Sequence, residues 1–250
     1  MKIRVELHTH TRYSQDSLLN KWFYLLMLKM KKINVIGITD HNEINGALEF
    51  KKFLERFDIK VIVGEEIFSS KGEIIGLFLT KKIDEGKSPR ETMKEIKKQG
   101  GLVYIPHPYD EKRYKTVLPE EEIEKNLDLI DIIEMHNGRN IKQCFSDYQL
   151  NIANKFNKTK SVGSDAHTFF ELGRNYNIIE SFSNQKEFLT NLNNSSFVKK
   201  DCIKLAHDVT KIVKIIKLFR KGKINEIYRI INKRYRRSER QVSPENRTRF

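Results

Sequence analysis

Residues 3–10 read IRVELHTH, a run rich in apolar residues that leads directly into His8 and His10. Residues 161–167 read SVGSDAH and repeat this arrangement, with Asp165 and His167 at the same spacing of two. A short apolar run is typical of a buried strand. Side chains two residues apart on a strand point to the same side, so each pair can bind one metal ion together.

The first 180 residues alternate short apolar runs with helical patterns. The apolar runs predict buried strands at residues 3–7, 35–39, 60–64, 102–105, 129–135, 161–163 and 176–179. Helical periodicity predicts helices at residues 17–32, 43–57, 88–99, 119–126 and 141–156, and residues 67–79 read as a hairpin. Such alternation favours parallel strands in an α/β fold, either closed as a (β/α) barrel or open as a doubly wound sheet.

Histidines gather at the ends of the predicted strands. A single histidine is more often a hydrogen-bonded structural residue, but six of the seven lie at the same end of successive strands. In parallel α/β folds these ends converge on one face, where active sites lie. Carboxylates accompany them, and a site of imidazole and carboxylate without thiolate suits zinc, manganese or iron. The histidines are His8, His10, His41, His107, His136 and His167, and the carboxylates are Asp16, Asp40, Glu65, Glu66, Glu134 and Asp165.

The two cysteines, Cys144 and Cys202, are far apart in the sequence. Their number and spacing exclude a disulfide scaffold and a Cys-based zinc site, and they suit a reducing compartment. The N-terminal residues lack the apolar segment of a signal peptide, and no stretch approaches the ~18 consecutive apolar residues of a membrane span. We therefore expect a cytoplasmic protein without a transmembrane segment.

Five short motifs resemble, in order, those of the PHP (polymerase and histidinol phosphatase) superfamily. They are LHTHTRYSQDS at residues 7–17, ITDHN at 38–42, GEE at 64–66, PHP at 106–108 and GSDAH at 163–167. The resemblance covers residues 3–180. It implies a distorted seven-stranded (β/α) barrel that holds two or three divalent metal ions, here Zn, Mn or Fe, at its C-terminal face.

The resemblance also implies a ligand for each motif. It assigns His8, His10, Glu66 and Asp165 to a first metal, and Asp16, His41 and His167 to a third. Glu66 bridges to a second metal, which His107 also binds. Glu66 is preferred to Glu65 because the motif of the superfamily is Gly-x-Glu at this point.

At the predicted fifth strand the sequence departs from many relatives, which place a histidine ligand there. This chain reads IEMHNGR at residues 133–139, and Glu134 and His136 would face the same way on an extended strand. Either could be the ligand. Asp40, next to a ligand, is interpreted as a residue that orients a histidine, and Glu65 as a structural residue.

The expected chemistry follows from the metals. Bound ions lower the pKa of water, so a bridging hydroxide could attack phosphorus near neutral pH. Asp165 or His167 could assist the leaving oxygen, and Arg139 and Arg12 are candidate phosphate clamps. The sequence contains no GxSxG elbow, no P-loop and no GxGxxG after a strand.

The positive charge is concentrated in the C-terminal part of the chain. Residues 199–250 contain 17 basic and 5 acidic residues, whereas residues 1–198 contain 30 and 28. Apolar residues recur at helical spacing over residues 203–219 and again over 224–235, and residues 241–250 are predicted to be disordered. The apolar stripe docks on the barrel, or the basic tail binds an anionic partner such as nucleic acid or a membrane surface.

These observations predict a PHP-like barrel over residues 1–200 and a basic helical extension over 201–250. The predicted function is metal-dependent hydrolysis of a small phosphomonoester, which makes the protein a phosphatase. A phosphodiesterase or exonuclease acting on nucleotides or nucleic acid is the alternative enzyme. A non-catalytic metal-binding module is the alternative of another class, and the nearly complete set of motif ligands argues against it.

Overall fold

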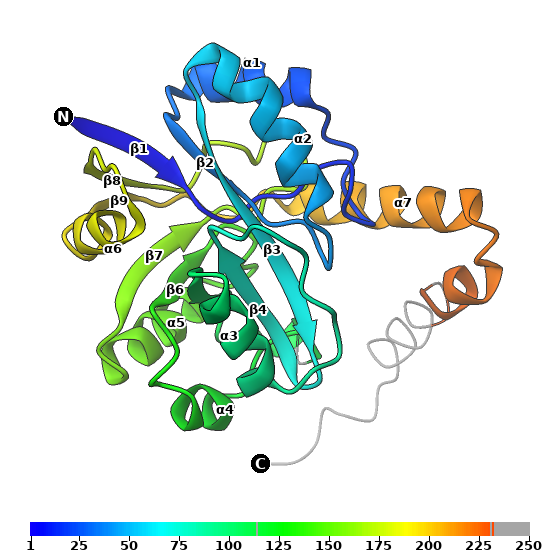
Figure 1. Ribbon diagram of the computed structural model, residues 1–250. Coiled ribbons are helices and arrows are strands. Elements are labelled where there is room, and N and C mark those ends of the chain that lie inside the picture. Colours follow the sequence, from blue (N-terminus) through cyan, green and yellow to red (C-terminus); the bar gives the residue numbers. More distant parts are fainter. Residues whose placement is uncertain (114, 231, 233–250) are drawn as a thin grey trace.

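A mixed sheet of nine strands forms the centre of the computed structural model, which describes residues 1–113, 115–230 and 232 (Figure 1). The strand order is β7-β6-β5-β4-β3-β2-β1-β8-β9. The strands are β1 (Lys2–Glu6), β2 (Val35–Ile38), β3 (Lys60–Ser69), β4 (Gly72–Leu77), β5 (Leu102–Ile105), β6 (Ile132–Asn137), β7 (Thr159–Gly163), β8 (Tyr176–Glu180) and β9 (Ser196–Val198).

The sheet closes almost completely between β1 and β7. Beyond the ends of these strands, the backbone N–H of His10 donates to the Ala166 carbonyl at 2.9 Å, and that of Asp165 donates to the His8 carbonyl at 2.9 Å. At the other end, the Asn177 amide of β8 donates to the carbonyls of Val5 and Val162, at 3.2 Å each. The predicted barrel is therefore confirmed, and the open doubly wound alternative is wrong.

The sheet differs from the prediction in strand number and direction. It has nine strands rather than seven, because the second strand of the predicted hairpin, β4, and the short β9 also join it. β4 is antiparallel to both β3 and β5, and β8 is antiparallel to β1. The expectation of parallel strands fails at these places because a tight turn joins β3 to β4, and the segment from β7 to β8 contains no helix.

Helices cover the outside of the sheet. The five predicted helices are present, and α3 begins with a capping box, in which Ser88 and Glu91 each accept a bond from the other's backbone N–H. The sequence did not predict α6. The helices are α1 (Lys21–Lys31), α2 (Asn45–Leu54) continued by the 3₁₀ turn Glu55–Phe57, α3 (Pro89–Lys98), α4 (Glu120–Lys125), α5 (Gln143–Lys155), α6 (Gln185–Asn193) and α7 (Lys204–Arg220).

Two apolar clusters form the core. The larger contains helix residues from α1 to α5, such as Leu28 and Phe50, packed on strand residues such as Ile36. The smaller contains residues from β1 to β6 and β8, with Phe188 and Leu192 of α6 as its helical members. Since α1 to α5 contribute nothing to the smaller cluster, it occupies the inner face of the barrel.

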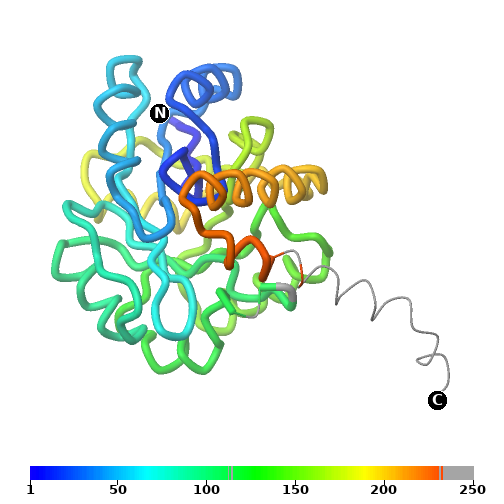
Figure 2. Tube along the Cα trace, turned by 90° about the vertical axis from the view of Figure 1, so that its right-hand side faces the viewer, coloured from blue at the N-terminus to red at the C-terminus, as the bar shows by residue number. Residues whose placement is uncertain are grey.

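Helix α7 crosses the barrel near the loop that follows β1 (Figure 2). Ala206, Val213 and Leu218 of its apolar stripe are buried, so the predicted docking of this stripe on the barrel is confirmed for one side of the helix. Other apolar residues remain exposed, among them Ile212 and Phe219.

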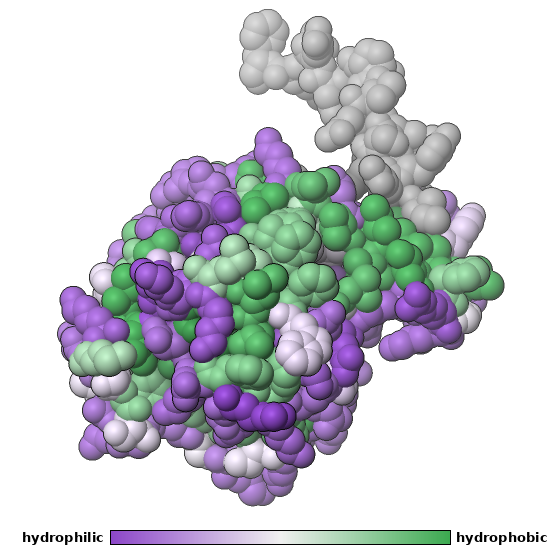
Figure 3. Space-filling model, turned by 90° about the horizontal axis from the view of Figure 1, so that it is seen from above, coloured by the Kyte–Doolittle hydropathy of each residue, from purple (hydrophilic) through white to green (hydrophobic). Residues whose placement is uncertain are grey.

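The face seen from above in Figure 3 carries hydrophobic residues at its surface. Exposed apolar side chains of α1, such as Trp22 and Leu26, add to those of α7. In the described part of the chain, no helix is long and apolar enough to cross a membrane. The predictions for residues 233–250, including the disordered end, lie outside the described residues.

Candidate metal centre

Eight of the predicted site residues come together where the barrel strands end. His8, His10, His107 and Asp165 are at most 2 % exposed, and Glu66 is 1 % exposed. The strand ends that carry them lie next to each other because β1 pairs with β2 and, beyond its end, with the chain that follows β7. The eight residues are His8, His10, Asp16, His41, Glu66, His107, Asp165 and His167.

The backbone turns sharply after several of these strands. Asn42, His107 and Asp165 have φ angles of 50°, 29° and 52°, in the left-handed region that residues other than glycine rarely adopt. Each such conformation costs on the order of 1–3 kcal/mol and persists only where the surrounding structure enforces it. Such enforced strain clusters at functional sites, and here it accompanies the turn of two site residues, His107 and Asp165.

Glu66, on β3, lies at the centre of the group. Its Oε1 is 3.4 Å from His8 Nε2 and 3.2 Å from His107 Nε2. Its Oε2 is 3.4 Å from His10 Nε2 and 2.9 Å from His41 Nδ1. Burial alone would raise the pKa of this carboxyl, but His8 and His41 hold it well below its usual value. One carboxylate thus touches four imidazoles.

Asp165 joins the same histidines from the opposite side. Its Oδ1 is 3.3 Å from His10 Nε2 and 3.7 Å from His8 Nε2. Its Oδ2 accepts a bond of 2.6 Å from Arg113 Nη1. Burial favours the neutral acid, yet the Arg113 guanidinium and His8 together keep the pKa of Asp165 well below its usual value.

Asp16 lies with His41 and His167 at another part of the same group, as predicted for the third metal. Its Oδ1 is 3.2 Å from His167 Nε2 and 3.8 Å from His41 Nε2. The His10 ring stacks on that of His167, with centroids 4.0 Å apart. Burial, together with His167 and His41, lowers the pKa of His10 well below its usual value, so this imidazole is neutral and free to bind a cation.

The far nitrogens of three of these histidines are held by other groups. His8 Nδ1 is 3.2 Å from Glu134, and His10 Nδ1 is 3.0 Å from Ser14 Oγ. His167 Nδ1 is 2.8 Å from the Asp165 carbonyl. Histidines that bind metals are usually oriented in this way, with the second nitrogen fixed by a carboxylate, hydroxyl or carbonyl.

The atoms that point into the group lack partners. Among the described residues, no hydrogen bond reaches five buried atoms of this group: His8 Nε2, His10 Nε2, Asp16 Oδ1, Glu66 Oε2 and His107 Nδ1. A buried polar atom without a partner costs about 1–3 kcal/mol. Two ligand atoms that share an ion at about 2.1 Å lie roughly 3.4 Å apart in a tetrahedral site. The His8 and His10 contacts of 3.3–3.7 Å match that spacing, so this donor set fits a multinuclear metal site.

The two candidates on β6 do not share a site. Glu134 accepts bonds from Tyr104 Oη at 2.7 Å, the His107 N–H at 2.6 Å and Asn137 Nδ2 at 2.9 Å, besides its contact with His8. His136 instead lies 2.8 Å from Ser146 Oγ, outside the group. The expectation that both face the same way is wrong because a β-bulge lies between them.

The two predicted arginines also differ. Arg12 does not line the cavity, and its exposed guanidinium pairs with Glu49 of α2 at 2.8 Å. Arg139 does line the cavity beside the group, and its Nη2 donates to Thr210 Oγ1 of α7 at 2.9 Å.

Asp40 and Glu65 have supporting contacts. Asp40 accepts bonds from Thr11 and Ser14, including one of 2.7 Å from Ser14 Oγ, and Ser14 in turn contacts His10. Asp40 therefore orients a histidine through Ser14 rather than directly. Glu65 accepts a bond of 2.9 Å from the Ile83 N–H, which agrees with a structural role.

Sequence reasoning missed Glu73 and Arg113. Glu73, on β4, is 3.6 Å from His41 Nδ1 and 3.5 Å from His107 Nε2, and it can form a metal-binding group with His41 and Glu66. Burial and the nearby Glu66 raise the pKa of Glu73 to about 7. Its place on the second strand of the predicted hairpin was the signal available. Arg113 lies in the segment after the Pro-His-Pro motif at residues 106–108, and no sequence pattern marks it as a site residue.

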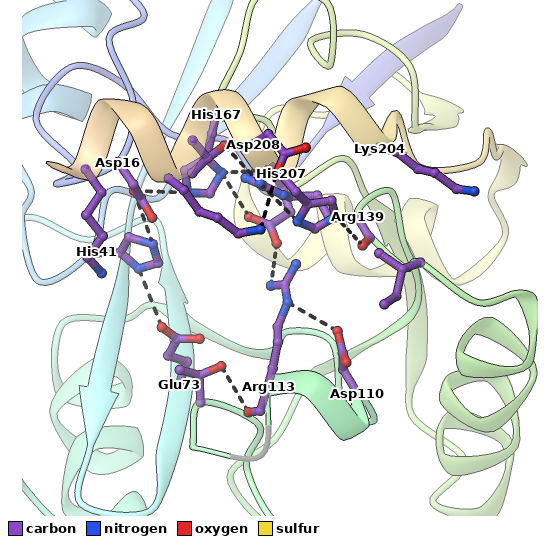
Figure 4. A pocket seen from close by; sticks show the side chains of 16 residues that line it. Asp16, His41, Glu73, Asp110, Arg113, Arg139, His167, Lys204, His207 and Asp208 are labelled. Carbon is purple, nitrogen blue, oxygen red and sulfur yellow. Dashed lines mark hydrogen bonds and ion pairs between the residues drawn. The ribbon is translucent and has the colours of Figure 1, made fainter. Parts of the chain in front are cut away.

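A cavity of about 580 Å³ opens beside the group (Figure 4). Asp16, His41 and Asp165 line it from the barrel. Lys204 and Lys211 line it from α7, which forms the opposite wall. The buried ligand atoms are therefore reached through a cavity that α7 helps to enclose.

A nearly closed α/β barrel with buried histidines and carboxylates at its strand ends defines a class of metal-binding barrels. Within that class, residues 6–239 match the model of the PHP domain, and the chain belongs to the PHP family. The predicted resemblance is confirmed.

Two relatives are uncharacterised proteins of Methanocaldococcus jannaschii. One is 44 % identical over 117 residues, which is 43 % of this chain and 68 % of that protein. The other is 33 % identical over 182 residues, which is 70 % of this chain and 69 % of that protein.

Solved structures resemble the barrel at lower identity. A two-domain protein of Bacteroides vulgatus that contains a predicted PHP-like metal-dependent phosphoesterase matches with a TM-score of 0.65 and 17 % identity, over 80 % of this chain and 65 % of that one. A lesion-specific endonuclease of Pyrococcus furiosus matches with a TM-score of 0.58 and 16 % identity, over 79 % and 58 %. This chain thus spans about two thirds or less of either protein, and the likeness shows the fold alone.

Proposed function

We propose that this protein is a metal-dependent phosphoesterase that hydrolyses a small phosphomonoester. The observation that carries the proposal is the convergence of unpartnered, buried nitrogen and oxygen atoms on one region of the barrel. When bound there, divalent ions such as Zn, Mn or Fe lower the pKa of water and neutralise charge on phosphate oxygens. The side chains described below hold the ions and position the substrate.

The contacts support three overlapping sets of ligands. His8, His10, Glu66 and Asp165 would hold the first ion, as the PHP motifs imply. Glu66 and His107 would hold the second, and Glu73 would supply the ligand that many relatives place on the fifth strand. The third ion would be held by Asp16, His41 and His167.

Other side chains would position these ligands and the substrate. Glu134 would fix the ring of His8 rather than bind an ion, since its oxygens already accept three hydrogen bonds. Arg113 lines the cavity and holds Asp165, so it takes the place of Arg12 as the cation beside the reacting phosphate. Asp165 or His167 would assist the leaving oxygen, and Arg139 would bind charge on the substrate.

The cavity favours a small substrate over a polynucleotide. Its volume of about 580 Å³ is within the range of small-molecule sites, and α7 encloses one side. A phosphodiesterase or exonuclease is the second candidate, because the lysines of α7 would attract a nucleic-acid backbone. A non-catalytic module is disfavoured because all eight motif ligands are present and gathered.

Hydrolysis assays with matched substrates test the proposal. The purified protein, loaded separately with manganese, zinc or iron, is assayed on p-nitrophenyl phosphate, bis(p-nitrophenyl) phosphate and a short oligonucleotide. We expect release of phosphate from the monoester, lost on chelation and restored by metal. Preference for the diester or the oligonucleotide would favour the second candidate. Absence of metal-dependent turnover on all three would contradict the proposal.

A further inference from the structure

One face of α7 lines the cavity with cationic side chains. Lys204, Lys211 and Lys214 all line it, together with His207. Spacings of three and four residues place these side chains on the same side of a helix. Figure 4 shows Lys204 at the far end of the cavity from Asp16 and His41. The lysines therefore lie across the cavity from the eight site residues and Glu73, which together are called the metal-binding group.

These lysines are not used by the fold. Among the described residues, Lys204 and Lys214 have neither a hydrogen bond nor an ion pair, and Lys211 reaches only Asp208, at 3.4 Å. The latter pair is exposed, so it contributes little to stability. The apolar residues of α7 hold the helix in place, and the lysines are free to bind a ligand.

Arg139 extends the same cationic wall into the protein. It is 5 % exposed, and its Nε lacks a hydrogen bond within the described residues, although Glu171 lies 3.6 Å away. A guanidinium is a strong binding group for carboxylate or phosphate, because its planar fork matches their geometry. Arg139 lines the cavity, outside the metal-binding group.

The charges of the two walls differ. Of the acidic residues that line the barrel side, Asp16, Glu73 and Asp165 belong to the metal-binding group, where bound ions offset their charge, and Asp110 pairs with Arg113 at 3.3 Å. On α7, Asp208 is the acidic residue among three lysines. With ions bound, the α7 side of the cavity has an excess of positive charge that a substrate with an anionic group only at its metal-bound end would leave unpaired.

We propose that Arg139 and the lysines of α7 form a second anion subsite, so that the substrate is a phosphoester with a second anionic group, either carboxylate or phosphate. The inference rests on the proposed function, in which the first phosphate occupies the metal-binding group. A cavity of about 580 Å³ holds a molecule with two such groups at its ends. In this proposal α7 selects the substrate, and the barrel residues carry out its hydrolysis.

A matched series of substrates tests this subsite. The metal-loaded protein is assayed on butyl phosphate, on its ω-carboxylate and on butanediol bisphosphate. A doubly anionic substrate should lower KM by roughly 10-fold or more, the scale of one hydrogen bond to a charged group. In the variant Lys204→Gln/Lys214→Gln this ratio of KM values should fall toward one. The exposed Lys221→Gln, at the end of α7 and outside the cavity, is the control and should keep the ratio.

Calorimetry with the phosphonate counterparts separates the subsite from turnover. Butane bisphosphonate should bind the metal-loaded protein more tightly than butylphosphonate, and the double variant should lose the difference. Equal binding of the two, or a preference that survives in the double variant, would overturn the subsite. If none of the esters is hydrolysed, the proposed function fails, and the calorimetric ratio still decides the subsite. Equal gains from carboxylate and phosphate would show that charge alone is recognised.

Discussion

At the end of the barrel, His8, His10 and Glu66 are almost completely buried, whereas on the opposite wall of the same cavity Lys204 and Lys211 of α7 are exposed. The rings of His8 and His10 are fixed by neighbouring side chains, while the lysines have few partners. The barrel core thus fixes the positions of the histidines and carboxylates that would bind metal. A separate helix, α7, supplies the opposite wall of the cavity, which would contact the substrate. Variants in the two regions should therefore fail in different ways.

The largest effect is expected from Glu66→Gln. A neutral amide cannot bridge two ions as a carboxylate does, so the protein should lose more than one ion per chain and all measurable turnover. Glu65→Gln is the matched control on the same strand, since the Glu65 side chain contacts Ile83 instead. Metal analysis and phosphatase assays on both variants make the comparison. A Glu66→Gln protein that keeps all its ions would show that this carboxylate is not shared.

A smaller loss is expected from Glu73→Gln. Glu73 contacts His107 and His41 at the edge of the group, so its removal should release one ion and leave the others bound. Activity should fall by at least about 10–100-fold, the range typical of residues that support a metal site. The metal content of this variant, compared with that of Glu66→Gln, shows which of the two residues holds more ions. Unchanged metal content would remove Glu73 from the ligand set.

On the other wall, Lys217→Met tests how α7 is held. The Lys217 ammonium donates to the carbonyls of Arg12, Ser14 and Ser17, at 2.7, 2.7 and 2.6 Å, on the loop that carries Asp16. Loss of these bonds should cost roughly 1–3 kcal/mol and lower the melting temperature by a few degrees, with the metal content retained. Lys221→Met, one turn further along, should melt like the wild type. A loss of metal as large as in Glu66→Gln would mean that α7 is part of the metal-binding group itself.

The smallest effect is expected on the stability of the protein at low pH, through His207 of α7. Burial and the nearby Arg139 lower the pKa of His207 to about 4, against an ordinary value of 6.5. Between pH 6.5 and 4, His207 is therefore protonated in the unfolded chain but not in the folded protein. The free energy of unfolding falls as the pH is lowered through this range. His207→Gln should remove this dependence. Melting temperatures of both proteins between pH 7.5 and 4.5 check it, and parallel curves would contradict it.

Most of the motif residues were predictable because they lie at or just beyond the ends of strands, whereas Asp16, ten residues beyond β1, was expected from the resemblance alone. The spacing of two in His8 and His10, and in Asp165 and His167, was enough to group them, because parallel strands end on one face. The barrel followed from the same alternation. These features depend on local sequence alone.

The remaining features depend on contacts that local patterns do not encode. Glu73 was missed because β4 enters the sheet between β3 and β5, an arrangement set by the tertiary fold. The bulge that separates Glu134 from His136 leaves no mark in the sequence. The pairing of Arg12 with Glu49 could not be predicted because Glu49 lies on α2 and is brought close only by folding.

The amount of metal bound per chain tests the central claim most directly. The protein is loaded with manganese, zinc or iron, freed of excess metal by gel filtration, and analysed for its elements against its measured protein concentration. The geometry of the buried group predicts two or three ions per chain with at least one of these metals. Fewer than one ion per chain with every metal would contradict the account, because the unpartnered ligand atoms would then serve no cation.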